Sequence, residues 1–475
     1  MEKQLFGTDG IRGVAGEPPL DATTVFIAGK CLGQYLHSQA SGPQVVTGPR
    51  VLIGPRVVIG EDTRESSRWI RETVAAGLQE AGVQTVAAGV VSTPAVAYLT
   101  ASADFAAGVM ISASHNPYRD NGIKVFASNG YKLPDAGELD VEGRIFAMLQ
   151  DGALLQDGAL LQDGSGAKPY RMAEEPDRSL AENYIDFLRR SIPSGKKLSG
   201  KLVIDCANGS ASRMVQEVFS GLGMELILLA GQPDGRNINL DCGALHMENL
   251  QKAVLREKAA LGVAFDGDAD RALFVSDRGR IVDGDGVLHI ASRYMRQRGL
   301  LKGNTVVGTV MTNLGLERAL ESEGLRLERT PVGDKYVLEQ MLRSGVNLGG
   351  EQSGHVIFSD LATTGDGLLT ALQILRIMAE TGQPLEELLR GLSVFPQTLR
   401  NVRVREKTPL ESMPQVMEQI RASEKSLGNS GRLLVRYSGT ELLARVMVEA
   451  ESAEQVDRHA SALVRAIEQS IGAQR

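Results

Sequence analysis

The sequence is poor in cysteine, and the three that it has, Cys31, Cys206 and Cys242, lie far apart among 475 residues. An odd and dispersed set of cysteines cannot supply the paired framework of a disulfide-stabilised domain. No Cys/His spacing typical of a zinc site accompanies them either. The composition therefore argues against both a disulfide scaffold and a zinc-binding module.

Long apolar runs and basic clusters are also missing. No stretch of 18 apolar residues occurs, and the opening MEKQLFGTDGIRG lacks the features of a signal peptide. We therefore expect a cytoplasmic protein without a membrane partner. With 51 basic against 58 acidic residues the net charge is −7, and no basic stripe appears, which argues against a nucleic-acid partner.

The length indicates several domains, because a chain of 475 residues is too long for one hydrophobic core. Apolar strands alternate with helical patterns through the first three quarters, as in βαβ units, and the last quarter alternates strands with two amphipathic helices. We predict an α/β protein with three mixed or parallel-sheet domains and a smaller α+β domain around a central cleft. The predicted domains are residues 1–178, 179–282, 283–393 and 394–475.

Two tandem repeats interrupt the first predicted domain. Three hexads, GPQVVT, GPRVLI and GPRVVI, run from Gly42 to Ile59, and LQDGAL is repeated between Leu149 and Gly164. Three hexads are too few to bury the core of a β-helix. Both repeats are interpreted as surface extensions, since lengthening a loop costs little entropy.

The first candidate site follows the apolar run 108–111, which is typical of a buried strand. The chain continues as Ser-Ala-Ser-His-Asn-Pro, and Pro117 forces a turn after Asn116. This predicts that Ser114 lies on an exposed loop at the carboxyl end of a strand, where open α/β sheets bind ligands. Lys124 follows on a second strand and would bring an ammonium group near the hydroxyl. The alternative is a simple strand end with an Asn-Pro turn.

The second candidate is the sequence Asp-Gly-Asp-Ala-Asp-Arg, which follows an apolar strand ending at Phe265. In an extended segment Asp266, Asp268 and Asp270 would point the same way and could bind one cation. Carboxylate oxygens suit Mg²⁺ or Ca²⁺. An EF-hand is excluded because Arg271 stands where that loop needs glycine. The alternative is a solvated acidic turn.

Two further loops carry polar groups after apolar strands. Residues 349–355 combine glycines with Glu351, Ser353 and His355, a set that suits sugar hydroxyls, although glycine loops without a ligand look similar. The second loop, Arg-Tyr-Ser-Gly-Thr at 436–440, is followed by Arg445 and could bind a phosphate through backbone amides and guanidinium groups. A hairpin turn with charged flanks is its alternative.

Together these motifs resemble the α-D-phosphohexomutase superfamily. The resemblance covers nearly the whole chain and rests on FGTDGIRG, ISASHNPYRDNGIK, DGDADR, GGEQSGH, TTGDG and RYSGTE followed by RVMVE, in that order. The family implies four domains and the interconversion of hexose 6-phosphates and 1-phosphates through a phosphoserine and a 1,6-bisphosphate. FGTDGIRG and Gln352 favour an amino sugar, whose product would feed UDP-N-acetylglucosamine and cell-wall precursors.

The resemblance also implies a role for each candidate residue. Ser114 would be the phosphoserine and would bind one Mg²⁺ together with Asp266, Asp268 and Asp270. Arg12, Lys124 and His355 would surround the transferred group, with Lys124 or His355 moving the proton. The sugar would be bound by Glu351, Ser353, Arg271 and Lys335, and the second phosphate by Arg436, Ser438, Gly439, Thr440 and Arg445.

The implied partner is a small phosphosugar, and the oligomeric state, monomer or homodimer, stays open. Ser114 would first be phosphorylated by glucose or glucosamine 1,6-bisphosphate or by a kinase. The alternatives are a glucose or mannose phosphate mutase of the same superfamily, a non-catalytic phosphosugar-binding protein, and a hydrolase. A phosphoserine open to water would be lost, which argues against the hydrolase.

Overall fold

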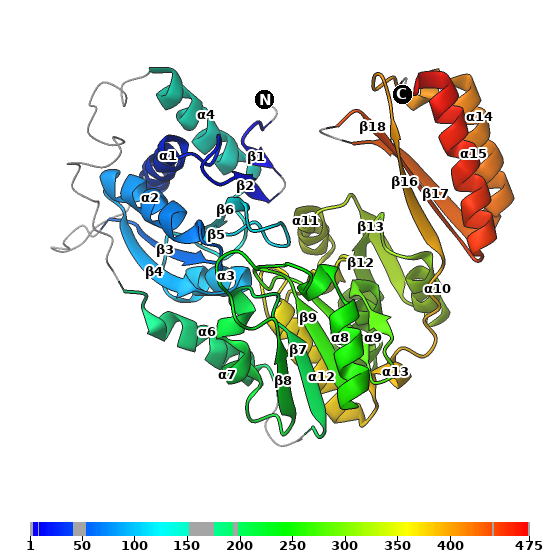
Figure 1. The fold of residues 1–475 in the computed structure, drawn as a ribbon, viewed down its shortest axis with the longest axis horizontal. Helices are drawn as coiled ribbons and strands as arrows, with labels where there is room; N and C mark the ends of the chain where they lie inside the picture. The colour runs from blue at the N-terminus through cyan, green and yellow to red at the C-terminus, as the bar shows by residue number, and fades with distance from the viewer. Residues whose placement is uncertain are drawn as a thin grey trace. The chain divides into compact units, whose positions relative to one another are not determined.

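The computed structural model describes residues 3–7, 9–40, 54–151, 175–192, 198–438 and 441–473. The chain divides into two compact units, Met1–Val310 with Glu328–Arg390, and Met311–Leu327 with Gly391–Arg475. Four β-sheets and their helices make up these units (Figure 1). The predicted fold class, mixed-sheet α/β layers followed by a smaller α+β part, is confirmed, while the four domain boundaries stay a prediction.

The first sheet has the strand order β1-β2-β6-β5-β3-β4. Strand β5 lies inside it, parallel to β3 and antiparallel to β6, and all five of its residues are buried. The strands are β1 (Phe6–Gly7), β2 (Gly10–Val14), β3 (Arg56–Glu61), β4 (Gln84–Val90), β5 (Ala107–Ile111) and β6 (Asp120–Ala127). The helices are α1 (Ala22–Ala40), α2 (Ser67–Glu80), α3 (Thr93–Ser102) and α4 (Asp135–Asp151).

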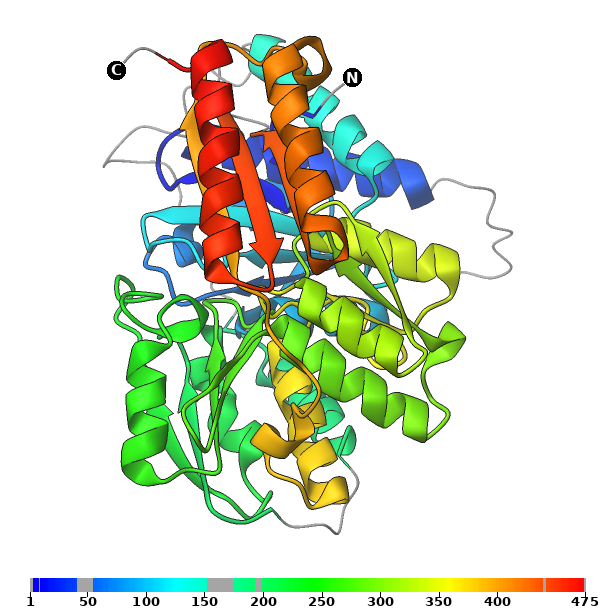
Figure 2. The same ribbon diagram turned by 90° about the vertical axis from the view of Figure 1, so that its right-hand side faces the viewer.

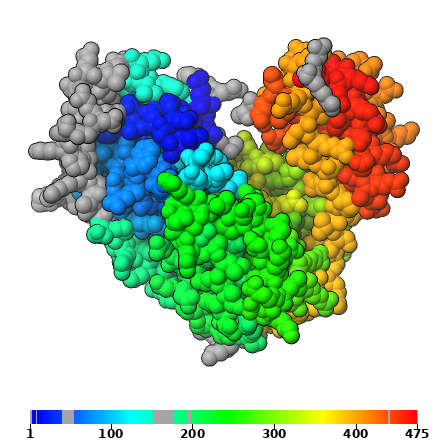
Figure 3. All heavy atoms as spheres, in the orientation of Figure 1, coloured from blue at the N-terminus to red at the C-terminus, as the bar shows by residue number. Residues whose placement is uncertain are grey.

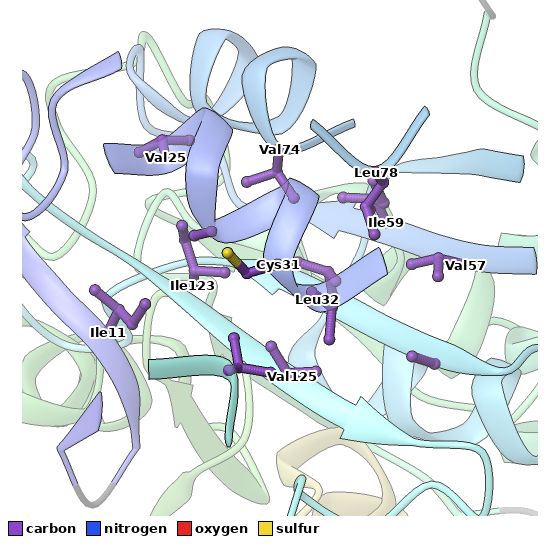
Figure 4. Packing of buried hydrophobic residues seen from close by; sticks show 14 of the residues in the cluster. Ile11, Val25, Cys31, Leu32, Val57, Ile59, Val74, Leu78, Ile123 and Val125 are labelled. Carbon is purple, nitrogen blue, oxygen red and sulfur yellow. The ribbon is translucent and has the colours of Figure 1, made fainter. Parts of the chain in front are cut away.

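Helices α1 and α2 pack against each other over the core of this sheet. Cys31 and Leu32 of α1 lie among buried side chains of α2 and of the strands, including Val74 and Ile123 (Figure 4). The helices cross closely because both lack a side chain at the contact. A Cβ atom at Gly29 would lie 2.2 Å from a backbone oxygen of α2, and one at Gly77 2.1 Å from a backbone oxygen of α1.

Helix α6 (Arg178–Arg190) leads from the first sheet to the second, whose order is β11-β10-β9-β7-β8. Its elements are β7 (Lys201–Asp205), α7 (Val215–Phe219), β8 (Glu225–Leu229), α8 (Glu248–Glu257), β9 (Leu261–Phe265), β10 (Ala272–Ser276) and β11 (Ile281–Val282). The green surface of this segment adjoins the blue and cyan surface of the first (Figure 3). Thr63 Oγ1 donates to the carbonyl oxygen of Asn208 across this contact (2.6 Å).

The third sheet has the order β13-β12-β14-β15. β12 is parallel to β14, and β14 and β15 are antiparallel neighbours. Its strands are β12 (Thr305–Thr309), β13 (Arg326–Thr330), β14 (Leu348–Gly350) and β15 (Val356–Phe358). The helices between residues 284 and 388 are α9 (Gly284–Gln297), α10 (Leu314–Ser322), α11 (Asp334–Ser344), α12 (Gly367–Thr381) and α13 (Leu385–Leu388), of which α10 is part of the second unit.

The second unit contains an antiparallel sheet of order β16-β18-β17, with two helices side by side over one face (Figure 2). Its elements are β16 (Gln397–Arg403), α14 (Pro414–Leu427), β17 (Gly431–Tyr437), β18 (Leu443–Ala450) and α15 (Ala453–Ile471). Helix α10 belongs to the same unit. Helix α14 begins at Pro414, because proline lacks the amide that a helix extending further toward the N-terminus would need there.

The repeats fall largely outside the described residues. Gly42–Ile53 and the second and third LQDG copies lie there, whereas the last hexad runs into the buried strand β3. Within the part of the chain that the structure describes, no helix is long and apolar enough to cross a membrane.

A buried carboxylate, paired with a partly exposed arginine, ties α10 to the sheet of the second unit. Glu449, which is fully buried, accepts from the Leu314 amide (2.8 Å) and from Arg432 Nε (2.6 Å). We expect Glu449→Ala to lower the stability of this unit by about 2 kcal/mol, because it leaves the Leu314 amide and the Arg432 guanidinium without their acceptor. Hydrogen exchange of the β16–β18 amides measures this change. Glu451→Ala, an exposed control, should change it by less than about 0.5 kcal/mol, and equal effects of the two variants would contradict the interpretation.

Candidate active site

Ser114 lies on the loop between β5 and β6, where the sequence predicted it. Its backbone has the left-handed φ of 52°, and its side chain is buried rather than exposed as expected. The backbone amide of Ser114 donates to Ser112 Oγ (3.0 Å). Ser114 Oγ donates to Asp266 Oδ2 over 2.5 Å and lies 3.3 Å from His115 Nδ1. The loop thus presents the hydroxyl to a carboxylate of the second sheet.

The three aspartates are buried, and their ligand atoms lie within 4.8 Å of one another. The prediction of an extended segment is wrong: Asp266–Asp270 form a turn between the antiparallel strands β9 and β10, and Ala269 has a φ of 55°. The turn, and not strand alternation, brings the carboxylates together. The turn lies directly against the serine loop, since a Cβ atom at Gly267 would be 2.5 Å from the Ser114 carbonyl oxygen.

These carboxylates fit a hard divalent cation. Asp268 Oδ1 and Asp270 Oδ1 are buried and make no hydrogen bond. Burial, together with the charges of Asp270 and Asp268, raises the pKa of Asp266 well above its usual range. Carboxylate oxygens are the ligands that Mg²⁺ and Ca²⁺ prefer. A bound cation would also offset the repulsion between these buried carboxylates. The cluster is therefore a candidate metal site.

Two groups orient Asp268 from its other side. Thr93 Oγ1, at the start of α3, donates to Asp268 Oδ2, and the Thr93 amide donates to the Asp268 carbonyl oxygen (3.0 Å). Lys124 Nζ lies 2.8 Å from the same Oδ2. Because Oδ2 is engaged by these donors, Oδ1 is the oxygen that can bind a cation.

Lys124 projects from β6 and is almost completely buried among carboxylates. Its Nζ lies 2.8 Å from Asp268, 3.0 Å from Asp9 and 3.6 Å from Asp270. Burial alone would lower the pKa of Lys124, but these three charges raise it well above its usual range. Lys124 is therefore a fixed ammonium group at neutral pH.

Asp9 joins the cations of the site. It pairs with Lys124, with Arg12 on β2 and with Lys132. Burial alone would raise the pKa of Asp9, but the charges of Lys124, Lys132 and Arg12 lower it well below its usual range. The predicted Arg12 is thus held beside the predicted Lys124 by a carboxylate that the sequence analysis did not single out.

His355 follows the short strand β14 and precedes β15. Its Nδ1 lies 3.6 Å from Asp270 Oδ2, and its Nε2 lies 3.8 Å from Asp334 Oδ2. The Gly365 amide donates to Nε2 (3.1 Å), and in the neutral ring this contact places the proton on Nδ1, facing Asp270. The predicted histidine therefore lies at the acidic cluster.

A cavity of about 390 Å³ opens beside these groups. Glu351 lines it, and its Oε1 accepts from the Gly333 amide (3.0 Å). Ser353 is exposed and does not line the cavity, and Lys335 lines a separate cavity, where it pairs with Asp135. The lining includes the charged or titratable residues Asp9, Arg12, His115, Asp270, Arg271, Asp334, Glu351 and His355.

The fourth predicted loop belongs to the second unit. Gly439 and Thr440 lie outside the described residues. Arg436 on β17 stands directly opposite Arg445 on β18, and Ser438 is buried. Arg445 Nε is buried without a hydrogen bond. Arg445 Nη2 lies 3.6 Å from Glu441 Oε2, so one carboxylate stands against two guanidinium groups at this hairpin end, which suits a phosphate as a further anion.

Sequence reasoning missed three groups that contact the predicted residues, namely Asp9, Thr93 and Asp334. Asp9 and Asp334 stand inside short motifs, FGTDGIRG and Val-Gly-Asp-Lys, whose basic neighbours were chosen instead. Thr93 carries no local signal, because a threonine at a helix start is usually a cap.

Comparison with known proteins covers almost the entire chain. The models for phosphoglucomutase/phosphomannomutase alpha/beta/alpha domains I, II and III match residues 3–151, 182–279 and 283–394, and the model for the C-terminal domain matches 399–466. A phosphoglucosamine mutase of Solibacter usitatus is 50% identical over 99% of this chain and 100% of its own length. A second phosphoglucosamine mutase, of Koribacter versatilis, is 49% identical over 99% of this chain and 98% of its own.

Solved structures share the fold. A phosphoglucomutase/phosphomannomutase family protein of Burkholderia thailandensis superposes with a TM-score of 0.76 at 25% identity, covering 98% of this chain and 97% of the other. An N-acetylphosphoglucosamine mutase of Aspergillus fumigatus, in complex with GlcNAc-6P and magnesium, superposes with a TM-score of 0.68 at 20% identity, covering 99% and 96%.

Proposed function

Because the chain belongs to the phosphoglucomutase/phosphomannomutase family, we propose that it acts as a phosphoglucosamine mutase. This isomerase interconverts glucosamine 6-phosphate and glucosamine 1-phosphate. Relatives of that name are about half identical to it over their full length. The observation that carries the proposal is the Ser114 hydroxyl, 2.5 Å from Asp266 at the edge of the buried acidic cluster. This arrangement supports a serine that carries a phosphoryl group beside a cation.

The proposed reaction has two transfers. In the first, the bond between Ser114 Oγ and phosphorus breaks, O1 of glucosamine 6-phosphate bonds to phosphorus, and the O1 proton passes to a protein group. In the second, the 1,6-bisphosphate has turned in the site, its 6-phosphoryl returns to Ser114 Oγ, and O6 takes a proton. The product is glucosamine 1-phosphate, and Ser114 is phosphorylated again.

Asp266, Asp268 and Asp270 would hold Mg²⁺, with the phosphate on Ser114 as a further ligand. When bound, the ion neutralises charge on the transferred phosphoryl group. The chain itself orients the ligands: Thr93 and Lys124 occupy one oxygen of Asp268.

Positive side chains would neutralise the rest of the negative charge on the transferred phosphoryl group. Lys124 and Arg12 are held together by Asp9, so two cations lie beside the acidic cluster without having to move during the transfer. Such fixed charge is effective because it needs no reorganisation as the transition state forms. Lys124, surrounded by three carboxylates, keeps its proton strongly. Lys124 and His355 are the two nitrogen groups proposed to move the proton during the transfers.

The C2 amine of the sugar is proposed to be read by the loop that follows β14. Gln352 follows Glu351 on this loop, and its side-chain carbonyl oxygen is a group that can accept from an ammonium. Glu351 places a carboxyl group at the wall of the cavity. Both groups favour a cationic amine over a hydroxyl.

Product analysis with glucosamine 6-phosphate, glucose 6-phosphate and mannose 6-phosphate in parallel tests this specificity. We expect glucosamine 6-phosphate to be preferred at least tenfold in kcat/KM, which needs only about 1.4 kcal/mol. Gln352→Ala should lower kcat/KM for glucosamine 6-phosphate more than it lowers kcat/KM for glucose 6-phosphate. If the wild type turned over glucose 6-phosphate or mannose 6-phosphate as well as or better than glucosamine 6-phosphate, the proposed substrate would be wrong and the proposed reaction would stand.

The phosphoserine makes a second prediction. Purified active enzyme should carry one phosphate on Ser114, detected by intact mass and peptide mapping. Ser114→Ala should lose more than 99% of kcat, a loss of at least about 2.7 kcal/mol in transition-state stabilisation. Ser128→Ala, an exposed serine of the same sheet region, is the control and should retain full activity. An active Ser114→Ala enzyme would overturn the assignment.

The metal site makes a third prediction. Asp268→Asn should weaken Mg²⁺ binding, measured by calorimetry, at least tenfold, because it removes one anionic oxygen ligand. Asp277→Asn, an exposed control directly after β10 at the other end of that strand, should bind Mg²⁺ as the wild type does. Unchanged binding in Asp268→Asn would show that the carboxylates are structural.

A further inference from the structure

A buried ion pair lies beneath the serine loop and has no part in the mechanism above. Asp62 and Arg64 follow strand β3, and both side chains are completely buried. Arg64 Nε donates to Asp62 Oδ2 over 2.8 Å. Burying a guanidinium group and a carboxylate is costly unless their remaining donors and acceptors are satisfied. Here nearly all of them are used, and most of them hold one loop.

Arg64 holds the loop through its backbone carbonyl oxygens. Nη2 donates to the carbonyl oxygens of Ser114 and Asn116, both at 2.9 Å, and Nη1 donates to that of Pro117. Asn239, from the second sheet region, also donates to the Ser114 oxygen (2.9 Å). One planar group thus fixes three of the four residues from 114 to 117.

Asp62 holds the same loop through a hydroxyl. Ser112 Oγ donates to Asp62 Oδ2 (2.7 Å) and accepts from the Ser114 amide (3.0 Å). The other oxygen of Asp62 accepts from Ser67 Oγ (2.7 Å) and from the Arg64 amide (3.0 Å). Both backbone polar groups of Ser114 are therefore held by residues that Asp62 itself positions.

This support matters because Ser114 has a left-handed backbone with a φ of 52°, which a residue with a side chain rarely adopts. We propose that Asp62 and Arg64 are positioning residues, which hold Ser114 in this conformation so that Oγ points at the acidic cluster. The proposal rests on the proposed function of Ser114. It assigns no substrate contact to either residue, so substrate affinity should be spared.

Steady-state kinetics test the proposal through Arg64→Lys and Ser112→Ala. Lysine keeps the charge but cannot reach three carbonyl oxygens and Asp62 at once, and we expect kcat to fall about 100-fold, as for a misplaced reacting group. Ser112→Ala removes only the link from Asp62 to the Ser114 amide, and we expect a fall of about tenfold. In both variants KM should stay within threefold of the wild-type value.

Arg71→Lys is the matched control. Arg71 is likewise a buried arginine of this sheet region, and among the described residues its ion pairs go to Glu61 (3.4 Å) and Glu72 (3.4 Å) and not to the serine loop. It should lose stability as Arg64→Lys does and yet keep kcat within threefold. The ³¹P resonance of phosphorylated Ser114 should shift or broaden in Arg64→Lys and Ser112→Ala, and stay unchanged in Arg71→Lys.

The outcomes separate the alternatives. If Arg64→Lys keeps kcat within threefold, or if Arg71→Lys loses as much, the pair is merely structural and the proposal is wrong. If Arg64→Lys does not fold, Ser112→Ala decides in the same way. The resonance test needs only phosphorylated Ser114, so an enzyme that turns over glucose 6-phosphate but not glucosamine 6-phosphate would contradict the proposed substrate and leave this proposal standing.

Discussion

Three carboxylates buried within 4.8 Å of one another are the constraint on which the first unit depends. Negative charges so close together in a buried turn repel strongly and are stable only with counter-charges. Lys124 comes from the first sheet, Arg271 follows the cluster directly, and the His355 ring, whose Nδ1 faces Asp270, comes from the third sheet as a polar partner. Each of the three sheets thus places a side chain at the aspartate cluster, and these interactions hold their loops together there.

Close backbone contacts make that convergence rigid. A Cβ atom at Gly267 would lie 2.5 Å from the Ser114 carbonyl oxygen, and one at Gly284 would lie 1.9 Å from the Glu351 carbonyl oxygen. At such positions a side chain would force two loops apart, so glycine lets main chains touch directly. Because backbone moves less freely than side chains, the charged groups are held in place before any ligand arrives. Preorganised charge of this kind is what phosphoryl transfer requires.

The sequence predicted those parts of the site that follow local patterns. Ser114 and the aspartates come directly after apolar strands, and apolar strands followed by polar turns can be recognised without knowing the fold. The shape of the aspartate turn could not be predicted, since it depends on the left-handed backbone of Ala269. The contacts of Asp9 and Thr93 could not be predicted either. They join residues more than 100 positions apart, and only the packed sheets bring them together.

The second unit carries the opposite imbalance. Arg436 and Arg445 face each other across two strands, and Glu441, 3.6 Å from Arg445, offsets one of these two positive charges, so a further anion is favoured at that end of the hairpin. Guanidinium groups recognise the oxygens of a phosphate and not the sugar ring attached to it. Such a pair would therefore bind a 1-phosphate and a 6-phosphate equally well. The proposed reaction needs a site that binds either phosphate. The 6-phosphate is held during the first transfer and is itself transferred in the second, when the 1-phosphate must be held instead.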